Sequence, residues 1–494
     1  MNGMQSSSNL LDEWLRSPIW SNSSSGVSNL QELGELKALE IFHMAVETVP
    51  AYKDFLKKHH IHQDSIATIA DFRNVPPTTK ENYINIYDAP SRCVGGSLLS
   101  KHMVSTSSGT TGKPHFWPRD IRTEIEGAHV HEMLLQTLYA IAEKKTLFIN
   151  GFAMGNWIAG TFTQACINLV SWKGYPMTLM TPGYSSETII ETLQGMGSMF
   201  DQVIIAGHTP FLKDLVEEMS GKGIDFDEPP LYLLGTGQSI SEEWRTYMLS
   251  LLHAEHEPHR FVNLYGSADA ALMGFETKAT IVIRQFLAQH HGLSRSLFSE
   301  ERLPSLYQYD PRFIYFESVT NELHITKYGG VPLVRYNIHD TGGVLSAGDL
   351  SGIATNAERE DEADLLGFPF VYLFGRDKFM TKIYGANVYT EHVQAALAHQ
   401  ALQKKLTGRF QILMDYDTEK NPKLKVRVEM CKGISHDSSL ADMVRNIFVS
   451  VVSELNSEYK DALLRNGEKA YPEIMLYEHG HQTYFPIGKV KKTA

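Results

Sequence analysis

The stretch Ser105-Thr-Ser-Ser-Gly-Thr-Thr-Gly-Lys-Pro114 combines hydroxyl side chains, two glycines and one lysine within ten residues. Glycine lets backbone N–H groups turn inward toward an anion, and Ser and Thr hydroxyls add further donors. The run therefore predicts a loop that wraps a polyphosphate. It is not a Walker A loop, because that motif needs four residues between its glycines, whereas two separate Gly109 from Gly112. Composition alone leaves a flexible Ser/Thr/Gly linker as the alternative.

Length and composition indicate a globular protein with more than one folding unit. The chain has 494 residues, 43% hydrophobic and 21% charged, and this length predicts about two to four domains or subdomains. The net charge of −12 argues against general nucleic-acid binding. Three widely spaced cysteines form no Cys-x-x-Cys pair. This argues against a disulfide framework or zinc site and for a reducing compartment, so we expect the cytoplasm.

One long uncharged stretch could in principle form a membrane-spanning helix. Residues 146–172 contain no Asp, Glu, Lys or Arg, but four Asn or Gln side chains and three glycines interrupt them. A spanning helix needs about 20 predominantly apolar residues. We therefore predict a buried strand, a glycine-rich turn and a buried helix here. The N-terminus also lacks the basic-then-apolar layout of a signal peptide, and we expect no membrane partner.

Apolar, strand-like runs alternate with amphipathic segments from about residue 144 to residue 265. The strand-like runs are 146–149, 202–206, 231–234 and 260–264. The segments between them include two with helical spacing, 211–219 and 242–252. This alternation predicts an α/β fold with a parallel sheet buried on both faces. Two later runs, 313–316 and 322–326, predict an antiparallel hairpin instead.

We expect three parts along the chain. Residues 1–28 hold two Ser-rich runs around Trp14 and Trp20 and predict a loosely ordered arm. Residues 29–374 form a large, multi-layered domain with mixed sheets. Residues 375–494 form a small, mobile α+β domain. Its expected elements are a helix at 391–402, strands at 409–414 and 424–430, and a long helix at about 440–458.

The glycine-rich run resembles the phosphate loop of the acyl-adenylate-forming superfamily, which reads Ser-Gly-Thr-Thr-Gly-x-Pro-Lys. That superfamily includes acyl-CoA synthetases, nonribosomal-peptide adenylation domains and luciferases. This chain departs from the pattern, because Lys113 precedes the proline and His115 stands where the family has lysine. The altered order is similar to the phenylacetate–CoA ligase branch. Val49-Pro-Ala-Tyr-Lys53 and Val75-Pro-Pro-Thr-Thr-Lys-Glu81 also resemble that branch.

Four further segments resemble the superfamily in its expected order. Tyr265-Gly-Ser-Ala-Asp269 is similar to Tyr-Gly-x-Thr-Glu, and Arg335-Tyr-Asn-Ile-His-Asp340 to Arg-Tyr-x-Thr-Gly-Asp. The run from Gly375 to Asn387 resembles the family's hinge motif, and Pro486-Ile-Gly-Lys-Val-Lys-Lys492 its terminal motif. Each match alone is weak. Together, five ordered matches cover essentially the whole chain after about residue 30.

The resemblance implies an enzyme that activates a carboxylic acid with ATP and Mg²⁺. It assigns the β- and γ-phosphates to a loop of seven residues: Ser107, Ser108, Gly109, Thr110, Thr111, Gly112 and Lys113. It assigns nucleotide contacts, mainly to adenine and ribose, to Gly235, Thr236, Gly237, Tyr265, Gly266 and Asp340, and a ribose or phosphate contact to Arg376. Asp269 would hold Mg²⁺ where the family usually has Glu. Lys489 would contact the α-phosphate and the attacking carboxylate, and Lys378 would be the hinge.

By family position, the acyl pocket would draw on six residues: Phe152, Met154, Trp157, Ala206, Gly207 and His208. Aromatic and small side chains there would fit a flat aryl acid, and they would equally fit core packing. Taken alone, Tyr265 and Asp340 also fit structural roles, and their order with the other motifs is what favours a site.

Three functions are compatible with the sequence. The first is an acid–CoA ligase that acts on an aryl or small organic acid, with CoA as co-substrate. The second shares the adenylation step but transfers the acyl group to an amine, a carrier-protein thiol or another nitrogen nucleophile. The third is a nucleotide-binding homologue without catalysis. Small molecules are the expected partners, nucleic acid is not, and a homodimer is one option for the assembly.

Overall fold

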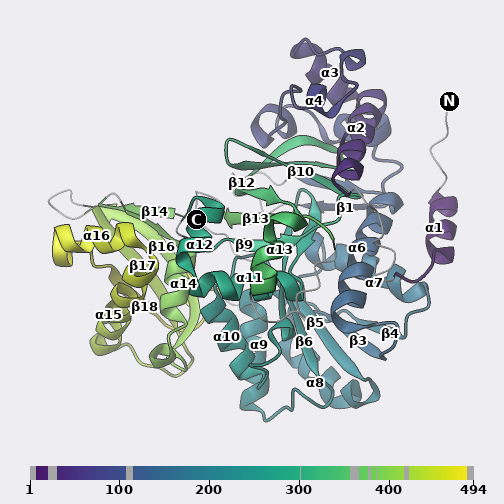
Figure 1. Ribbon diagram of the computed structural model, residues 1–494. Helices are drawn as coiled ribbons and strands as arrows, with labels where there is room; N and C mark the ends of the chain where they lie inside the picture. Colours follow the sequence, from purple (N-terminus) through teal and green to yellow (C-terminus); the bar gives the residue numbers. More distant parts are fainter. Residues whose placement is uncertain are drawn as a thin grey trace.

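An 11-stranded mixed sheet forms the centre of the computed structural model (Figure 1). Its strand order is β10-β11-β12-β13-β9-β8-β7-β6-β5-β3-β4. The structure describes residues 7–20, 30–106, 115–300, 302–356, 367–375, 380–384, 386–416 and 422–486. Within these residues, no helix is long and apolar enough to cross a bilayer.

One half of the large sheet is parallel, as the apolar runs predict. Its strands are β3 (Thr146–Asn150), β4 (Met177–Met180), β5 (Gln202–His208), β6 (Leu231–Thr236) and β7 (Phe261–Ser267). Helices cover both faces: α6 (Ile121–Tyr139), α7 (Ile158–Trp172), α8 (Ser186–Met196), α9 (Thr209–Gly221) and α10 (Glu242–Leu251). Alternate side chains of each strand face opposite sides. Phe148 therefore packs with α6 and α7, whereas Leu147 and Ile149 pack with α8, α9 and α10.

The other half of the sheet is antiparallel. Its strands are β8 (Ala271–Phe275), β9 (Ser305–Gln308), β10 (Ile314–Val319), β11 (Glu322–Lys327), β12 (Leu333–Leu345) and β13 (Phe370–Gly375). The predicted hairpin is confirmed as β10–β11. Helices that pack here or nearby are α2 (Leu30–Thr48), α3 (Pro50–Lys58), α4 (Ile69–Phe72), α5 (Ala89–Arg92), α11 (Lys278–Gln289), α12 (His291–Phe298) and α13 (Ala347–Asn356).

For residues 7–20, the expectation of a loosely ordered arm is wrong. They form helix α1 (Ser7–Arg16) and a short extension that lie against α6 (Figure 1). The Trp14 side chain is 2% exposed, and its Nε1 donates a hydrogen bond to the Leu169 carbonyl over 2.9 Å. The backbone N–H of Trp20 donates to the buried Glu132 carboxylate over 3.1 Å. Two aromatic anchors thus fix a segment whose Ser-rich surroundings suggest disorder.

The C-terminal part has its own three-stranded sheet and its own hydrophobic cluster. Its elements are β14 (Met380–Ile383), β15 (Ala386–Tyr389), α14 (Thr390–Leu397), β16 (Leu406–Tyr416), β17 (Pro422–Met430), α15 (Ser438–Leu455), α16 (Ser457–Asn466) and β18 (Glu473–Tyr477). The predicted strands are confirmed. The predicted long helix instead ends at Leu455. Asn456 then accepts the Tyr459 N–H and caps a second helix, a role that asparagine favours.

Candidate active site

A two-stranded hairpin carries the glycine-rich run. Its strands are β1 (Met103–Thr106) and β2 (Phe116–Arg119), and their last pair is Thr106 with Phe116. The Thr106 N–H donates to the Asn156 carbonyl over 2.9 Å, and Thr106 also forms a β-bridge with Trp157. The run itself, residues 107–114, lies outside the described residues, as do Arg376, Lys378 and Lys489. The described part of the hairpin therefore fixes where the loop begins and ends.

Asp269 lies in the turn between β7 and β8, and two polar groups hold its carboxylate. The Tyr336 hydroxyl donates to Oδ2 over 2.7 Å, and the Lys80 ammonium lies 3.0 Å from the same oxygen. The side chain of Asp269 is only 4% exposed. Burial, followed by the charge of Lys80, lowers the pKa of His115, and Asp269 partly opposes this effect. A lysine, a histidine and a carboxylate thus share one electrostatic environment at the root of the hairpin.

Sequence reasoning missed Lys80 as a member of this site. Its segment pairs with β12, because the Thr78 N–H donates to the Arg335 carbonyl and the Asn337 N–H donates to the Thr78 carbonyl, over 3.2 and 2.9 Å. The family-like run from Val75 to Glu81 was visible in the sequence. The sequence does not indicate that Lys80 pairs with a residue as far along the chain as Asp269.

The turn behind Asp269 is held from β11. The buried Lys327 ammonium donates to the carbonyls of Ala270 and Leu272 over 2.6 and 2.7 Å. Burial lowers the pKa of Lys327 to about 8, and Glu126 opposes this shift. One bond to the turn and one to the start of β8 limit how far the Asp269 backbone can move.

The Tyr265 and Asp340 motifs also meet. The Tyr265 hydroxyl donates to Asp340 Oδ2 over 2.7 Å, and both residues are 6% exposed. Together with the Tyr336–Asp269 bond, this gives a reciprocal arrangement. The tyrosine of each motif donates to the aspartate of the other. Two segments that are distant in sequence are therefore cross-connected at two points.

Gly235, Thr236 and Gly237 lie at the carboxyl end of β6, beside the end of β5. The Thr236 hydroxyl donates to the Leu264 carbonyl over 2.8 Å. Gly237 has φ of +95°, and a Cβ there would lie 2.5 Å from the His208 ring. Glycine is therefore required by both backbone conformation and space. The proposed adenine-side turn and the proposed acyl-pocket histidine are direct neighbours.

The other proposed acyl-pocket residues divide into two groups. Phe152 and Ala206 are buried within the hydrophobic cluster that α6 and α7 cover, where they serve core packing. Met154, Trp157 and His208 are partly exposed at the carboxyl ends of β3 and β5. Tyr184 and Phe211, which sequence reasoning missed, pack edge-to-face nearby at 4.6 Å between ring centroids. Their positions just after β4 and β5 were the available signal.

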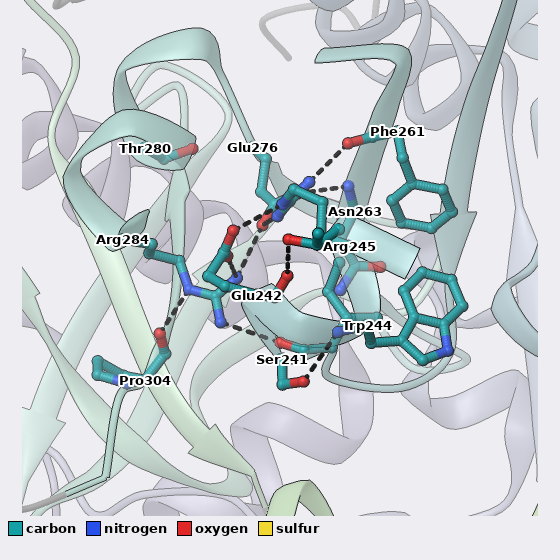
Figure 2. Close-up of polar contacts among 12 residues, drawn as sticks. Ser241, Glu242, Trp244, Arg245, Phe261, Asn263, Glu276, Thr280, Arg284 and Pro304 are labelled. Atoms are coloured by element: carbon teal, nitrogen blue, oxygen red, sulfur yellow. Dashed lines mark hydrogen bonds and ion pairs between the residues drawn. The ribbon is translucent and has the colours of Figure 1, made fainter. Parts of the chain in front are cut away.

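A cluster of four buried charges lies behind the site (Figure 2). Arg245 lies 2.6 Å from Glu276 and 3.0 Å from Glu242, and Arg284 lies 2.7 Å from Glu242. Burial alone lowers the pKa of Arg245, but Glu242 and Glu276 outweigh it and raise the pKa. Burial raises the pKa of Glu242, but Arg245 and Arg284 outweigh it and lower the pKa. Glu242 and Arg245 thus stabilise each other's charged forms.

This buried cluster reaches the site through Asn263. Glu276 accepts the Asn263 N–H over 2.7 Å (Figure 2). The Asn263 side chain donates to the Gln238 carbonyl and the Tyr307 hydroxyl over 3.1 and 3.0 Å. The Tyr307 ring stacks on Tyr265 with centroids 5.5 Å apart. The cluster therefore supports both the turn after β6 and the ring of Tyr265.

The chemistry of Asp269 fits a magnesium ion that phosphate oxygens also bind. Among the described residues, no three His, Cys, Asp or Glu side chains gather closely enough to hold a metal by themselves. Mg²⁺ usually keeps several waters and binds through one or two carboxylates together with substrate phosphates. The buried Asp269 carboxylate, oriented by Tyr336, supplies a hard oxygen ligand of this kind.

Comparison with solved structures identifies proteins that share the fold of this chain. No family model and no curated protein matches the chain in sequence. The solved structure of 2-hydroxyisobutyryl-CoA ligase with 2-HIB-AMP in the postadenylation state is similar, with a TM-score of 0.64 and 13% identity over 97% of this chain and 92% of that one. The same ligase with 2-HIB-AMP and CoA in the thioesterification state gives 0.53 and 14% over 95% and 89%.

A structure of McyG A-PCP with phenylalanyl-adenylate is also similar, with a TM-score of 0.52 and 11% identity over 100% of this chain and 95% of that one. The chain therefore has the fold of the acyl-adenylate-forming ligases. This confirms the predicted α/β class, with a large mixed sheet and a smaller C-terminal sheet region.

Proposed function

We propose that the protein is an ATP-dependent carboxylic-acid ligase that forms an acyl-adenylate and releases pyrophosphate. The reciprocal Tyr265–Asp340 and Tyr336–Asp269 hydrogen bonds support this proposal, because they join the two motifs whose carboxylates we assign to ribose and to Mg²⁺. The β1–β2 hairpin and Lys80 add the start of a phosphate loop and a cation at the same place.

The chemistry needs this combination because a carboxylate is a poor acyl donor. One carboxylate oxygen attacks the α-phosphorus of ATP, the bond to the β-phosphate oxygen breaks, and pyrophosphate leaves. Backbone N–H groups and lysines that stabilise the growing charge lower the barrier. Bound Mg²⁺ would neutralise charge on the phosphates. Asp269 would hold it, while Tyr336 and Lys80 orient that carboxylate.

We propose CoA as the acceptor, with an aryl or small organic acid as substrate. The similar 2-hydroxyisobutyryl-CoA ligase was solved with CoA, which supports this choice. The alternative acceptors are an amine, a carrier-protein thiol or another nitrogen nucleophile. The similarity to the McyG A-PCP structure is consistent with an acceptor other than CoA. In each case the nucleophile attacks the acyl carbon, the bond to AMP breaks, and AMP leaves.

The first prediction tests adenylation directly. With ATP, Mg²⁺ and a suitable acid, the protein should exchange labelled pyrophosphate into ATP, because acyl-adenylate formation is reversible. The measurement is isotope exchange over a panel of aryl and short-chain acids, with the acid omitted as the control. Release of ADP and phosphate would contradict the proposal and indicate an acyl-phosphate intermediate. No exchange with any acid would favour the non-catalytic homologue.

Adding candidate acceptors to the same assay then distinguishes an acid–CoA ligase from a ligase that uses another acceptor. Steady AMP formation that needs CoA, with an acyl-CoA product seen by mass spectrometry, supports CoA as acceptor. AMP formation that needs an amine would instead assign the amide-forming alternative.

The second prediction concerns Mg²⁺. Tyr336→Phe keeps the ring but removes the hydroxyl that orients the Asp269 carboxylate. Loss of such an outer partner typically costs 10–100-fold in metal affinity, so half-maximal exchange should need about tenfold more Mg²⁺. Tyr309→Phe, a buried tyrosine of the same hydrophobic cluster, is the matched control. An unchanged Mg²⁺ requirement in Tyr336→Phe would mean that Asp269 does not hold the metal.

We further propose that residues 29–374 and 375–494 are two domains and that Lys378 is the hinge between them. β13 ends at Gly375, which has φ of +86°. Arg302 donates to the Phe374 carbonyl over 3.1 Å and lies 3.4 Å from the Tyr389 ring centroid. These contacts join the described residues on either side of the proposed hinge to one arginine of the large part.

The third prediction follows from this hinge. Proline fixes φ near −65° and removes the N–H, and hinge residues must absorb large φ/ψ changes. Lys378→Pro should therefore keep adenylate formation near normal and reduce transfer to the acceptor by at least about tenfold. Single-turnover kinetics of each half-reaction provide the measurement. Lys378→Ala, which removes the charge but not the mobility, should be close to wild type. Equal loss of both steps in Lys378→Pro would argue against a rotation.

A further inference from the structure

A buried arginine near the candidate active site lacks a carboxylate partner. Among the residues that the structure describes, six arginines are buried. Five of them lie within 3.6 Å of a carboxylate oxygen: Arg119, Arg245, Arg260, Arg284 and Arg335. The sixth, Arg92, is 4% exposed and forms no such ion pair with a described residue. Burial of a charge without a partner is costly, so folding stability does not explain an arginine at this place.

Arg92 uses few of its hydrogen-bond donors within the protein. It is the last residue of α5, and its Nε donates to the Asp88 carbonyl over 3.3 Å. Its Nη1 is buried and has no hydrogen-bond partner among the described residues. The Asp88 carboxylate instead accepts the Ser91 N–H over 3.3 Å. Because a guanidinium carries five N–H donors, Arg92 keeps donors that no described residue uses.

Arg92 lies at the edge of the candidate site. The segment after α5 is joined to the start of β12's approach, because the Val94 N–H donates to a carbonyl of the loop before β12 over 3.1 Å. Burial lowers the pKa of Arg92, and nearby groups that include Tyr83 and Tyr336 oppose this effect. Tyr336 is also the residue whose hydroxyl donates to the Asp269 carboxylate. Arg92 and Asp269 are thus neighbours of the same tyrosine.

The described side chains leave this part of the site with excess positive charge. Lys80 and Asp269 offset each other at 3.0 Å, whereas Arg92 has no carboxylate of its own. Burial, followed by the charge of Lys80, lowers the pKa of His115, and the charge of Arg92 adds to this effect. The run between β1 and β2, residues 107–114, contains no Asp or Glu. Because arginine stays ionised in proteins, a bound anion would supply the missing negative charge.

We propose that Arg92 is a ligand-binding residue that takes an oxyanion, either a phosphate or a carboxylate group of a substrate. This inference rests on the proposed function for the identity of that group, because ATP and a carboxylic acid would each bring one. The planar fork of a guanidinium matches both groups through two parallel N–H···O bonds. Since Arg92 has no carboxylate partner in the described protein, no internal ion pair has to break when the anion binds.

The test measures anion binding and needs no turnover. Thermal unfolding of the full chain is followed at constant ionic strength over a concentration series of inorganic pyrophosphate and, separately, of benzoate. A ligand that binds only the folded protein raises the unfolding temperature, so at least one of these anions should stabilise the wild type. Arg92→Met should weaken the affinity for that anion by about 10- to 100-fold, because a hydrogen bond to a charged group is lost. The anion that is affected identifies the bound group as phosphate or carboxylate.

Unfolding without any anion gives a second measurement. Arg92→Met should unfold at the wild-type temperature or above it, because it removes a buried charge that no carboxylate offsets. Arg260→Met is the matched control, since Arg260 is also buried but lies 2.8 Å from Asp227 and 3.0 Å from Glu257. It should unfold at a lower temperature and keep the wild-type response to both anions. A purely structural role of Arg92 would give the pattern of Arg260→Met instead.

The inference is wrong if neither anion stabilises the wild type, or if Arg92→Met responds to both anions as the wild type does. If Arg92→Met unfolds early and also loses the response, Arg92→Lys decides, because it restores the charge: a recovered response supports anion binding, and no recovery overturns it.

Pyrophosphate exchange tests the proposed function separately. Exchange in the wild type together with an unchanged anion response in Arg92→Met would leave the proposed function standing and remove this inference. An anion response that Arg92→Met loses, together with no exchange for any acid, would keep Arg92 as an anion-binding residue and contradict the proposed function.

Discussion

Lys489→Ala is expected to slow adenylate formation by about 10²–10³-fold, or roughly 2.7–4 kcal/mol of transition-state stabilisation. The reason is that a positive charge between the carboxylate and the α-phosphate matters most while that phosphorus is attacked. If the C-terminal domain rotates before transfer, the lysine has left the site by then. The variant should therefore process a synthetic acyl-adenylate at a near-normal rate. Single-turnover kinetics with both substrates provide the measurement.

Two neighbouring lysines are the matched controls. Lys491→Ala and Lys492→Ala remove the same charge from the same chain end and should have mild effects on both steps. If Lys489→Ala behaves like these neighbours, Lys489 is a surface charge and the proposed active site lacks its catalytic lysine.

Arg245→Met is expected to lower the free energy of unfolding by about 3–5 kcal/mol, the typical cost of removing one partner of a buried ion pair. Arg245 is fully buried and lies within 3.0 Å of both Glu242 and Glu276. Without it, two carboxylates share one remaining arginine, Arg284. Urea unfolding followed by tryptophan fluorescence measures the change, because Trp244 packs on Phe261 beside the cluster (Figure 2).

An exposed ion pair provides the control for the loss of unfolding free energy. Arg445→Met removes a pairing with Asp442 at the surface of α15, and exposed pairs contribute only about 0–1 kcal/mol. A loss in Arg245→Met no larger than in Arg445→Met would show that the large part of the fold tolerates uncompensated charge at this place. The support that the cluster gives to Asn263 would then be dispensable.

The sequence predicted the elements whose signal is local. Runs such as 202–206 and 231–234 are short, apolar and flanked by helical patterns, so their parallel pairing followed. The motifs around Tyr265 and Asp340 were also visible. Their reciprocal bonds were not, because hydrogen bonding between distant segments leaves no mark on spacing or composition.

The missed features share a physical cause, which is burial of residues that usually lie at the surface. Glu242 and Arg245 read as an exposed i,i+3 pair of a helix, and only their contacts with Glu276 and Arg284 reveal a buried cluster. Lys80 lies in a polar run whose partner is far along the chain. Such pairings become apparent only once the β12 strand and the turn after β7 are placed together.

The reciprocal tyrosine–aspartate bonds couple the two motifs that we propose for the nucleotide. They link the position of each carboxylate, Asp269 and Asp340, to the other motif, so a change in either motif should alter how the other contacts the proposed nucleotide. The residues proposed for the acid lie instead at separate strand ends and carry none of these bonds. If the proposed function holds, substitutions at Met154 and Trp157 should change the choice of acid while the two tyrosine–aspartate bonds remain.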